Sequence, residues 1–139
     1  MKIEVNEARE FERVSSLMED PAAVFVFGSN LRGAHAGGAA RAARLHYGAL
    51  EGKGVGFWGR SYAIPTMDEA LRTLPLEEID VYVHRFLRAA KALPERIFVV
   101  TRIGCGIAGY QDEQIAPLFD LAPENVKLPE GWREYNLDG

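Results

Sequence analysis

The pattern of apolar and polar residues along the chain predicts strands that alternate with helices. Three short runs rich in β-forming residues are expected to be strands, at residues 23–27, 61–64 and 97–103. The first run is wholly apolar, which is typical of a strand that is buried on both faces of a sheet. The residues expected to end the three strands are Gly28, Pro65 and Gly104.

The most regular helical pattern lies between the second and third of these runs. Its apolar residues recur at spacings of three and four, which places them on one helix face. They are Ile79, Tyr82, Val83, Phe86, Leu87, Ala90 and Leu93. Pro75 suits the first helical position, and Pro94 is expected to end the helix. Glu77 and Glu78 complement the positive end of the helix dipole.

Near the two ends of the chain the pattern is shorter. Residues 2–5 are a candidate edge strand, and residues 126–128 are a candidate last strand. Asn6 is expected to cap a short helix, whose inward residues would be Phe11, Val14 and Leu17. Residues 112–121 read as helical, with an interruption at Pro117, which has no amide donor.

An alanine-rich helix is also expected from Gly38 to about Tyr47, closed by Gly48 in the left-handed conformation. The alternation of strands and helices predicts an α/β fold. We expect a three-layer α/β/α sandwich around a mixed, largely parallel sheet.

Length and composition are typical of one globular domain that spans residues 1–139. The chain is 47% hydrophobic and 26% charged, and a chain of this length can build a core without disulfides. Its single cysteine, Cys105, excludes an internal disulfide and a zinc site built from several cysteines. Because the three histidines are scattered as well, no metal and no cofactor is implied.

Net charge and hydropathy argue against two classes of partner, nucleic acids and membranes. Sixteen Lys and Arg against twenty Asp and Glu give a net charge of −4, which argues against a general nucleic-acid binder. No apolar run approaches the ~20 residues that a membrane-spanning helix needs. The first residues carry acidic side chains and no apolar signal region. We therefore expect a cytoplasmic protein that does not contact membranes.

The formula Gly-x-Gly-x-x-Gly occurs twice, and its surroundings separate the two cases. The copy at residues 54–59 leads into a strand, so we interpret it as a turn or loop. The copy at residues 104–109 leaves the third strand and enters a helical segment, where bare backbone amides hold anions. Only 30 residues follow Gly109 (139 minus 109), too few for a dinucleotide-binding fold. The second copy is therefore predicted to be a phosphate-binding loop.

A second glycine-rich loop, at residues 28–38, also joins a strand to a helix. It reads Gly-Ser-Asn-Leu-Arg-Gly-Ala-His-Ala-Gly-Gly. Ligands of open α/β sheets bind beyond the carboxyl ends of the strands, so both loops are expected at the same edge. Two facing loops of this kind suit a diphosphate. The alternative is that the glycines only make tight turns.

At these two loops the sequence resembles a macro domain, the ADP-ribose-binding α/β/α module. Such a domain typically runs from a strand through Asn-Ala-Ala-Asn and a glycine-rich loop into a helix that opens Gly-Ala-Ile. Residues 28–30 (Gly-Ser-Asn) stand where the first motif ends, and residues 37–40 (Gly-Gly-Ala-Ala) stand at the helix opening. Residues 103–110 stand at the family's second loop, with matching spacing. The resemblance covers about residues 22–120.

Two further runs, at residues 25–30 and 61–66, are similar to a divergent, phage-associated subfamily of macro-like domains. They read Phe-Val-Phe-Gly-Ser-Asn and Ser-Tyr-Ala-Ile-Pro-Thr. The resemblance implies a macro-domain-like fold whose partner is ADP-ribose or an ADP-ribosylated macromolecule. A nucleic acid would enter only as such a substrate. The Gly-Asp-Ile motif with which the family reads the adenine amino group has no clean counterpart here.

The resemblance also implies a binding site made from both loops. Its residues are Gly28, Ser29, Asn30, Gly37 and Gly38 in the first loop, and Gly104, Cys105, Gly106, Ile107, Ala108, Gly109 and Tyr110 in the second. The amides of the second loop would hold the diphosphate. Asn30 would bond the distal ribose hydroxyls, and Tyr110 would form a wall beside that ribose. The alternatives are a turn role for Asn30 and simple packing for Tyr110.

Three residues are candidates for chemistry on a bound ADP-ribosyl group. Asn30 would orient the distal ribose while water attacks its anomeric carbon. His35 is a candidate phosphate contact or general acid or base, or an exposed loop histidine. Asp68 is a candidate for activating the water, or a turn cap. A phosphate oxygen of the substrate is a further candidate base. For Cys105 we favour a small loop residue over a nucleophile.

The sequence thus predicts a module that binds ADP-ribose, or a derivative of it, through two facing glycine-rich loops. Hydrolysis of an ADP-ribosyl linkage, as by an ADP-ribosyl glycohydrolase, is left open. One alternative is a non-catalytic reader or sequestering module for ADP-ribose or a related signalling nucleotide, which would release no product. The other is an interaction domain with purely structural glycines, which would not bind ADP-ribose.

Overall fold

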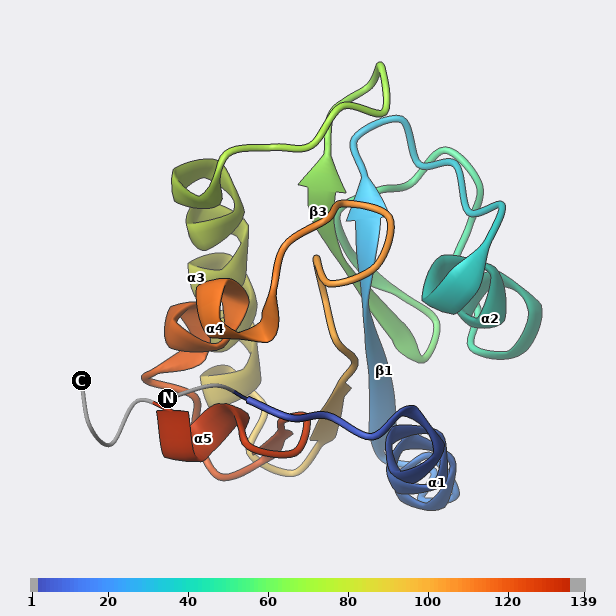
Figure 1. Cartoon of the computed structure of the whole chain (residues 1–139). Helices are drawn as coiled ribbons and strands as arrows, with labels where there is room; N and C mark the ends of the chain where they lie inside the picture. Colours follow the sequence, from blue (N-terminus) through green and yellow to red (C-terminus); the bar gives the residue numbers. More distant parts are fainter. Residues whose placement is uncertain (1–2, 136–139) are drawn as a thin grey trace.

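In the computed structural model, which describes residues 3–135, five strands form one mixed sheet in the order β2-β3-β1-β4-β5 (Figure 1). Their bounds, in that order, are Gly56–Trp58, Ser61–Met67, Ala23–Asn30, Ile97–Val100 and Val126–Lys127. β1 pairs in parallel with β3 and β4, β5 pairs in parallel with β4, and β2 runs antiparallel to β3. The prediction of an α/β fold with a mixed, largely parallel sheet is confirmed.

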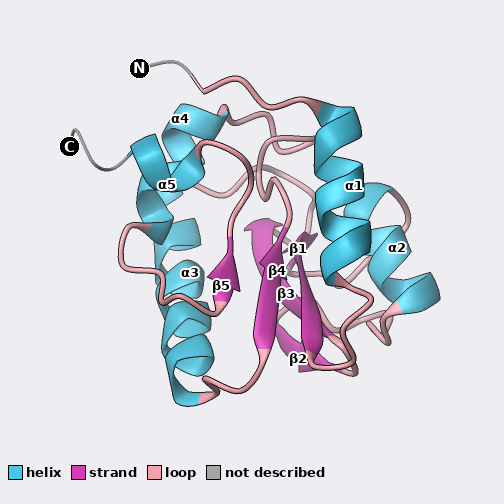
Figure 2. Cartoon of the chain, turned by 90° about the horizontal axis from the view of Figure 1, so that it is seen from below, coloured by secondary structure: helices cyan, strands magenta, loops and turns pink. Residues whose placement is uncertain are grey.

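Helices cover both faces of this sheet (Figure 2). On one face lie α1 (Glu7–Leu17) and α2 (Gly38–His46). On the other face lie α3 and three short elements. Their bounds are Leu76–Ala92 for α3, Asp112–Ile115 for α4, Ala116–Phe119 for the 3₁₀ helix η1 and Trp132–Tyr135 for α5. The arrangement is compatible with the predicted three-layer sandwich.

The two faces of β1 pack into separate apolar cores. Val24 and Val26 belong to the core beneath α3, whereas Phe25 and Phe27 belong to the core beneath α1 and α2. All four side chains are buried. This double burial explains why the sequence of the strand is continuously apolar rather than alternating.

The two best helical predictions are confirmed. α3 begins at Leu76, so Pro75 is its N-cap and not its first helical residue as expected. The predicted inward residues from Ile79 to Ala90 are buried except for Tyr82, which is half-buried. α2 begins at Gly38, and Gly48 beyond its end has φ +83°, the left-handed conformation expected of it. Both helices could be read from sequence because their periodicity is local.

The predicted ends of the three main strands are wrong. β1 continues through Gly28 to Asn30, and β3 continues through Pro65 to Met67. The proline is tolerated because it lies at an irregularity, where the pairing register shifts between Ser29 and Asn30. β4 is shorter than predicted and ends at Val100. Beyond it the chain turns, and the Ile103 amide donates to the Thr101 carbonyl over 2.7 Å.

Residues 54–59 were expected to form only a turn or loop, but they include β2. Trp58 pairs with Ser61 across a two-residue turn. That turn contains Gly59 with φ +60°, a conformation that tight hairpins need and glycine adopts readily. Three residues of strand carry too little periodicity to be recognised from sequence. The predicted last strand is confirmed as β5, at Val126–Lys127.

The predictions for the amino-terminal segment are correct in part. Residues 3–5 form no strand, and Lys2 lies outside the described residues. Asn6 caps α1, because its side chain accepts a hydrogen bond from the Arg9 amide over 3.0 Å. Phe11, however, is 74% exposed. The inward face of α1 follows residues 10, 13, 14 and 17, which leaves Phe11 pointing outward.

The segment after the second glycine loop is interrupted at Pro117, as expected. α4 covers Asp112–Ile115, and η1 follows directly with Pro117 in its first turn.

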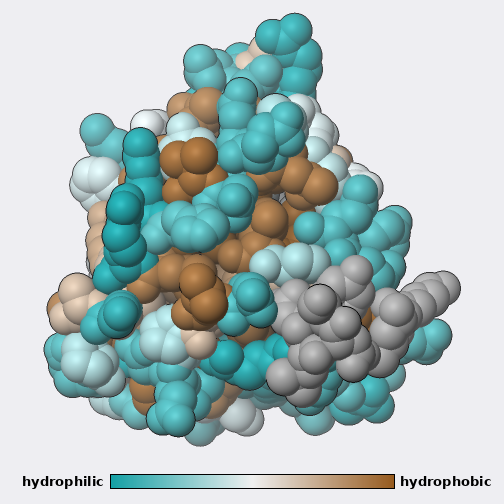
Figure 3. Space-filling view, turned by 90° about the vertical axis from the view of Figure 1, so that its left-hand side faces the viewer, coloured by the Kyte–Doolittle hydropathy of each residue, from teal (hydrophilic) through white to brown (hydrophobic). Residues whose placement is uncertain are grey.

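Side chains of α3, α4 and η1 form part of one molecular face, on which apolar surface remains visible between polar residues (Figure 3). Within residues 3–135, no helix is both long enough and apolar enough to span a membrane.

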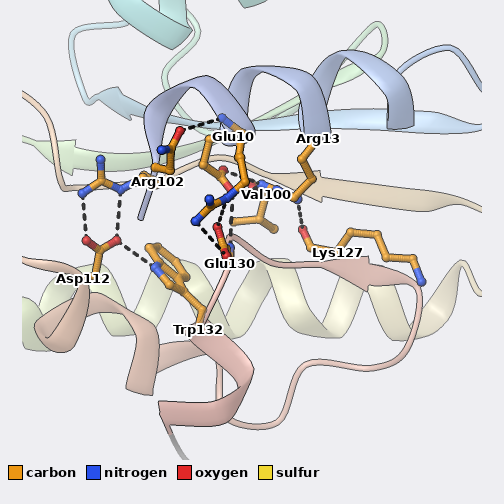
Figure 4. Close-up of polar contacts among 10 residues, drawn as sticks. Glu10, Arg13, Val100, Arg102, Asp112, Lys127, Glu130 and Trp132 are labelled. Carbon is orange, nitrogen blue, oxygen red and sulfur yellow. Dashed lines mark hydrogen bonds and ion pairs between the residues drawn. The ribbon is translucent and has the colours of Figure 1, made fainter. Parts of the chain in front are cut away.

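A polar cluster joins α1, the end of β4, α4 and α5 (Figure 4). The buried carboxylate of Asp112 accepts hydrogen bonds from Arg102 Nε (3.0 Å), Arg102 Nη2 (2.8 Å) and Trp132 Nε1 (2.8 Å). Glu10 pairs with Arg13, which also donates to the Val100 carbonyl over 2.6 Å. Four segments that are distant in sequence are therefore held by charge-assisted hydrogen bonds.

Two opposing effects act on the pKa of Asp112. Burial alone raises the pKa of this carboxyl, but the hydrogen bonds from Arg102 and Trp132 lower it more, so the net pKa lies below 3.8. A carboxyl whose pKa is lowered by folding stabilises the folded state above its unfolded pKa. That contribution is lost as the pH falls through the folded value.

We expect Asp112→Asn to lower the free energy of unfolding by about 2 kcal/mol at pH 7. The substitution leaves Arg102 without its bidentate partner. The expected loss of stability is modest because Arg102 is partly solvated. Urea unfolding measures this difference, with Asp120→Asn as a control on an exposed aspartate. The difference between wild type and Asp112→Asn should shrink as the pH falls below 3.8. A difference that does not change with pH would contradict the assignment.

Candidate functional site

Three loops meet beyond the carboxyl ends of β1, β3 and β4, at the upper edge of the sheet in Figure 1. They are the first glycine loop after β1, residues 68–74 after β3, and the second glycine loop after β4. The Leu31 amide donates to the Met67 carbonyl over 2.9 Å, and Thr73 Oγ1 donates to the Ala108 carbonyl over 2.9 Å. The structure therefore brings the two predicted loops to the same edge.

Some glycines of these loops are required by the fold itself. Gly104 has φ +77°, and a Cβ built on it would lie 2.9 Å from Ile115 Cδ1. Gly33 has φ +76°, and its Cβ would lie 2.3 Å from the carbonyl carbon of Gly52. A Cβ on Gly28 would meet the Gly104 amide nitrogen at an ordinary 3.5 Å. Gly33 and Gly104 are therefore needed for the fold itself, in agreement with the alternative that the glycines only make tight turns.

Other glycines of the loops face open space. A Cβ on Gly37, Gly38, Gly106 or Gly109 would meet no atom of another described residue within 4 Å. Gly38 (φ +57°) and Gly109 (φ +88°) still have a conformational reason to be glycine. Gly37 has φ −150°, and Gly106 is also outside the left-handed region. Neither conformation nor crowding by the described residues explains glycine at positions 37 and 106.

The helix that begins at the first loop is distinctive in its charge. α1, α3, α4 and α5 all carry acidic residues in their first turns, whereas α2 carries none. Its N-cap is Gly37, which offers no side-chain hydrogen bond to the first amides. Acidic residues near a helix amino terminus compete with a bound anion. The beginning of α2 is free of that competition.

Asn30 lies at the end of β1, where the resemblance places it, but its side chain already has partners. Its Nδ2 donates to the Ala34 carbonyl and its Oδ1 accepts from the Ala34 amide, both over 3.0 Å. The turn role is therefore present. One further hydrogen remains on Nδ2 and one further lone pair on Oδ1 for a ribose hydroxyl. Ser29 points inward instead, because its Oγ donates to the Gly54 carbonyl over 2.5 Å.

His35 is fully buried, so it is not the exposed loop histidine that was one of its two interpretations. Its ring packs edge-on against Phe27, with ring centroids 5.4 Å apart. Nε2 lies 3.1 Å from the Lys53 carbonyl, whereas Nδ1 has no hydrogen-bond partner among the described residues. A substrate at the loop surface does not reach this ring, so we assign His35 no part in proton transfer.

Asp68 caps the turn after β3. Its carboxylate accepts from the Ala70 and Arg72 amides, both over 2.9 Å, and pairs with Arg72 Nε over 3.2 Å. The hydrogen bond from the Arg72 amide is the largest of the effects that hold the pKa of Asp68 below its usual value. A carboxylate with a lowered pKa is a weaker base. The turn-cap interpretation of Asp68 thus describes its contacts.

The other candidate side chains of the second loop pack against the protein. Tyr110 donates its hydroxyl hydrogen to the Leu74 carbonyl over 2.6 Å and packs against the core beneath α3. Ala108 is buried. Cys105 is half-buried, and burial together with the Asp112 charge raises its pKa to about 12. Ile107, by contrast, is 91% exposed at the tip of the loop.

The structure adds residues that the sequence did not indicate. The turn at residues 50–54 packs against the first loop, and Thr73 and Leu74 bond to the second. These contacts join residues far apart in the chain, so no local pattern could have revealed them. Within residues 3–135, no three His, Cys, Asp or Glu side chains come together to hold a metal ion.

A shallow depression of about 520 Å³ lies at the other end of the sheet, away from the glycine loops. Its lining includes Lys91 and Pro94 near the end of α3, Arg96 and Ile97 at the start of β4, and Lys127 of β5. This hollow does not coincide with the loops. We place the site at the loops because they offer backbone amides at the carboxyl ends of parallel strands.

Comparison of the chain with known protein families, with characterised proteins and with solved structures finds no match in any of the three. The function is therefore inferred from the loops themselves.

We expect Cys105 to react far more slowly with a thiol reagent in the folded protein than in the unfolded chain. A rise of the pKa from 9.0 to about 12 reduces the thiolate fraction at pH 8 about 1000-fold, and the thiolate is the reacting form. Reaction with a chromogenic disulfide, with and without denaturant, measures the two rates. Equal rates would show an accessible thiolate and would reopen a nucleophilic role.

Proposed function

We propose that this chain binds ADP-ribose, or a derivative that carries it, between the two glycine loops. The observation that carries the proposal is the openness of Gly37 and Gly106. Neither has a left-handed backbone, and a Cβ on either would meet nothing within 4 Å. Glycine at such positions allows the oxygens of a ligand to approach the backbone closely. One such glycine in each facing loop suits a ligand with two linked phosphates.

The electrostatics of the edge support an anionic ligand. α2 offers its first amides without an acidic residue in its first turn, and a phosphate is stabilised at such a helix end. Arg32 in the first loop and Arg41 in α2 are exposed. These positive groups lie on the segment that begins where β1 ends, although the whole chain has a net charge of −4.

The order of the elements supports the resemblance to macro domains. A buried strand leads into the first glycine loop and a helix, and a later strand follows the long helix α3 and leads into the second loop. The resemblance adds two riboses and an adenine to the diphosphate that the loops suggest. Asn30 retains hydrogen-bonding capacity for the ribose beyond the phosphates.

The side chains at this edge favour binding without turnover. His35 is buried, Asp68 is engaged in capping its turn, and the pKa of Cys105 is about 12. A general base for water must lie within hydrogen-bond reach of it and have a pKa near the working pH. We therefore propose a reader or sequestering module. Hydrolysis would depend on a phosphate oxygen of the substrate as the base, with Asn30 orienting the ribose.

We expect calorimetry to show binding of ADP-ribose and none of adenosine, because backbone amides of both loops hold the diphosphate. Gly106→Val should raise the Kd for ADP-ribose at least tenfold, which corresponds to a loss of about 1.4 kcal/mol or more of binding free energy. The reason is that the substitution places a branched side chain where the phosphate approaches the backbone. The fold should persist, because a Cβ at this position would meet no atom within 4 Å beyond the neighbouring residues in the chain. Ala92→Val, exposed at the end of α3, is the matched control.

Equal affinity for adenosine and ADP-ribose would argue against a diphosphate site. Full affinity in a folded Gly106→Val protein would argue against the second loop as the place of contact.

We expect the wild-type protein to bind a mono-ADP-ribosylated peptide without releasing ADP-ribose. Chromatographic detection of free ADP-ribose over hours, beside calorimetry on the same preparation, separates the two properties. Release above the rate of the peptide alone would contradict a pure reader. In that case Asn30→Ala, which removes the side chain best placed to orient the ribose, should abolish the release.

A further inference from the structure

We propose that His35 and the turn at residues 50–54 hold the first glycine loop in its ligand-binding shape, so that His35 is a positioning residue. The inference rests on the proposed site, because the first loop contributes half of it. The turn joins the end of α2 to β2 and would otherwise have no part in a site at the carboxyl edge of the sheet.

Four hydrogen bonds connect the turn to the first loop. The Gly52 amide donates to the Gly33 carbonyl over 2.9 Å. The His35 amide donates to Glu51 Oε1 over 2.8 Å, and His35 Nε2 lies 3.1 Å from the Lys53 carbonyl. The fourth bond is the one from Ser29 Oγ to the Gly54 carbonyl. The loop is therefore attached from its start to its middle.

Two glycines bring the segments into direct backbone contact. A Cβ on Gly54 would lie 1.9 Å from the Asn30 carbonyl oxygen. A Cβ on Gly33 would lie 2.3 Å from the Gly52 carbonyl carbon. Side chains at either position would force the turn away from the loop. The contact is thus a built feature of the chain rather than an incidental approach of two surfaces.

The hydrogen bonding of the His35 ring shows what the histidine supplies. A carbonyl oxygen only accepts, so the ring must carry its hydrogen on Nε2 and donate it to Lys53. In the neutral imidazole Nδ1 is then an acceptor, and it is buried without a partner among the described residues. An unpaired buried acceptor is unfavourable. An apolar ring packed on Phe27 would avoid that cost but could not hold the turn.

His35 is close in sequence to the amides that we assign to the ligand. His35 stands two residues before Gly37, the N-cap of α2. Arg44 of α2 donates from Nε to the His35 carbonyl over 3.3 Å and pairs with Glu51 over 3.7 Å. The backbone around His35 is therefore bonded to the turn on one side and to α2 on the other. A loop held in one conformation binds its ligand with a smaller loss of conformational entropy.

Three substitutions of His35 test this role in the full chain. Glutamine places an amide hydrogen near the position of Nε2, asparagine reaches only as far as Nδ1, and phenylalanine keeps the ring without a donor. We expect His35→Phe and His35→Asn to raise the Kd for ADP-ribose about tenfold, the effect of one lost buried hydrogen bond. His35→Gln should stay within about threefold of wild type. Affinity is measured by calorimetry well below each unfolding midpoint.

Amide hydrogen exchange of residues 33–38 gives a second readout that needs no ligand. Exchange should be faster in the Phe and Asn variants and close to wild type in the Gln variant. If the wild type binds no ADP-ribose, the proposed function fails, and exchange still decides whether His35 positions the loop. The inference would be overturned if all three variants matched the wild type in affinity and in exchange rate. It would also be overturned if all three lost affinity and exchange protection to the same extent.

Ser29→Ala removes a different hydrogen bond of the same contact and serves if the His35 variants do not fold. Its matched control is Ser61→Ala, since Ser61 Oγ also donates to a carbonyl, that of Trp58, over 2.6 Å, but at the opposite end of the sheet. The inference is supported if residues 33–38 exchange faster than in the wild type in Ser29→Ala but not in Ser61→Ala. It is overturned if these residues exchange at the same rate in the two variants.

Discussion

The parallel pairing of β1 with β3 on one side and β4 on the other is the constraint on which the candidate site depends. Parallel strands end at the same edge, so the segments that leave them meet there. The pairing starts from a strand that is buried on both faces, with Phe25 opposite Ser61 and Val99. Without that pairing, the two glycine loops would not meet at one edge of the sheet.

The two loops are held by different means. The second loop is closed at its base, because Arg102 before it and Asp112 after it form a bidentate pair. Tyr110 fixes its far end to Leu74. The first loop has no ion pair within it and is instead attached to the neighbouring turn through backbone groups and a buried histidine. Both loops contain open glycines, at which a Cβ would meet no described atom, beside backbone that is held by fixed contacts.

This division supports the binding role that we propose for the edge. The side chains with acid-base chemistry are used to support the backbone: Asp68 caps a turn, Asp112 closes a loop and His35 braces one. The contacts of these side chains are thus made within the protein. Backbone amides need no proton transfer to hold a diphosphate. The proposed module therefore draws its specificity from shape and from amide direction.

The sequence by itself determined β1, α2, α3 and the position of both glycine loops, because these depend on local periodicity and on residues such as Gly48 with one strong preference. The tertiary structure alone decided where strands end, as at Pro65, and which side of α1 faces inward, as Phe11 shows. It also decided the burial of His35 and the fixed partners of Asp112. Those outcomes arise from contacts between residues far apart in the chain, whose geometry no local spacing contains.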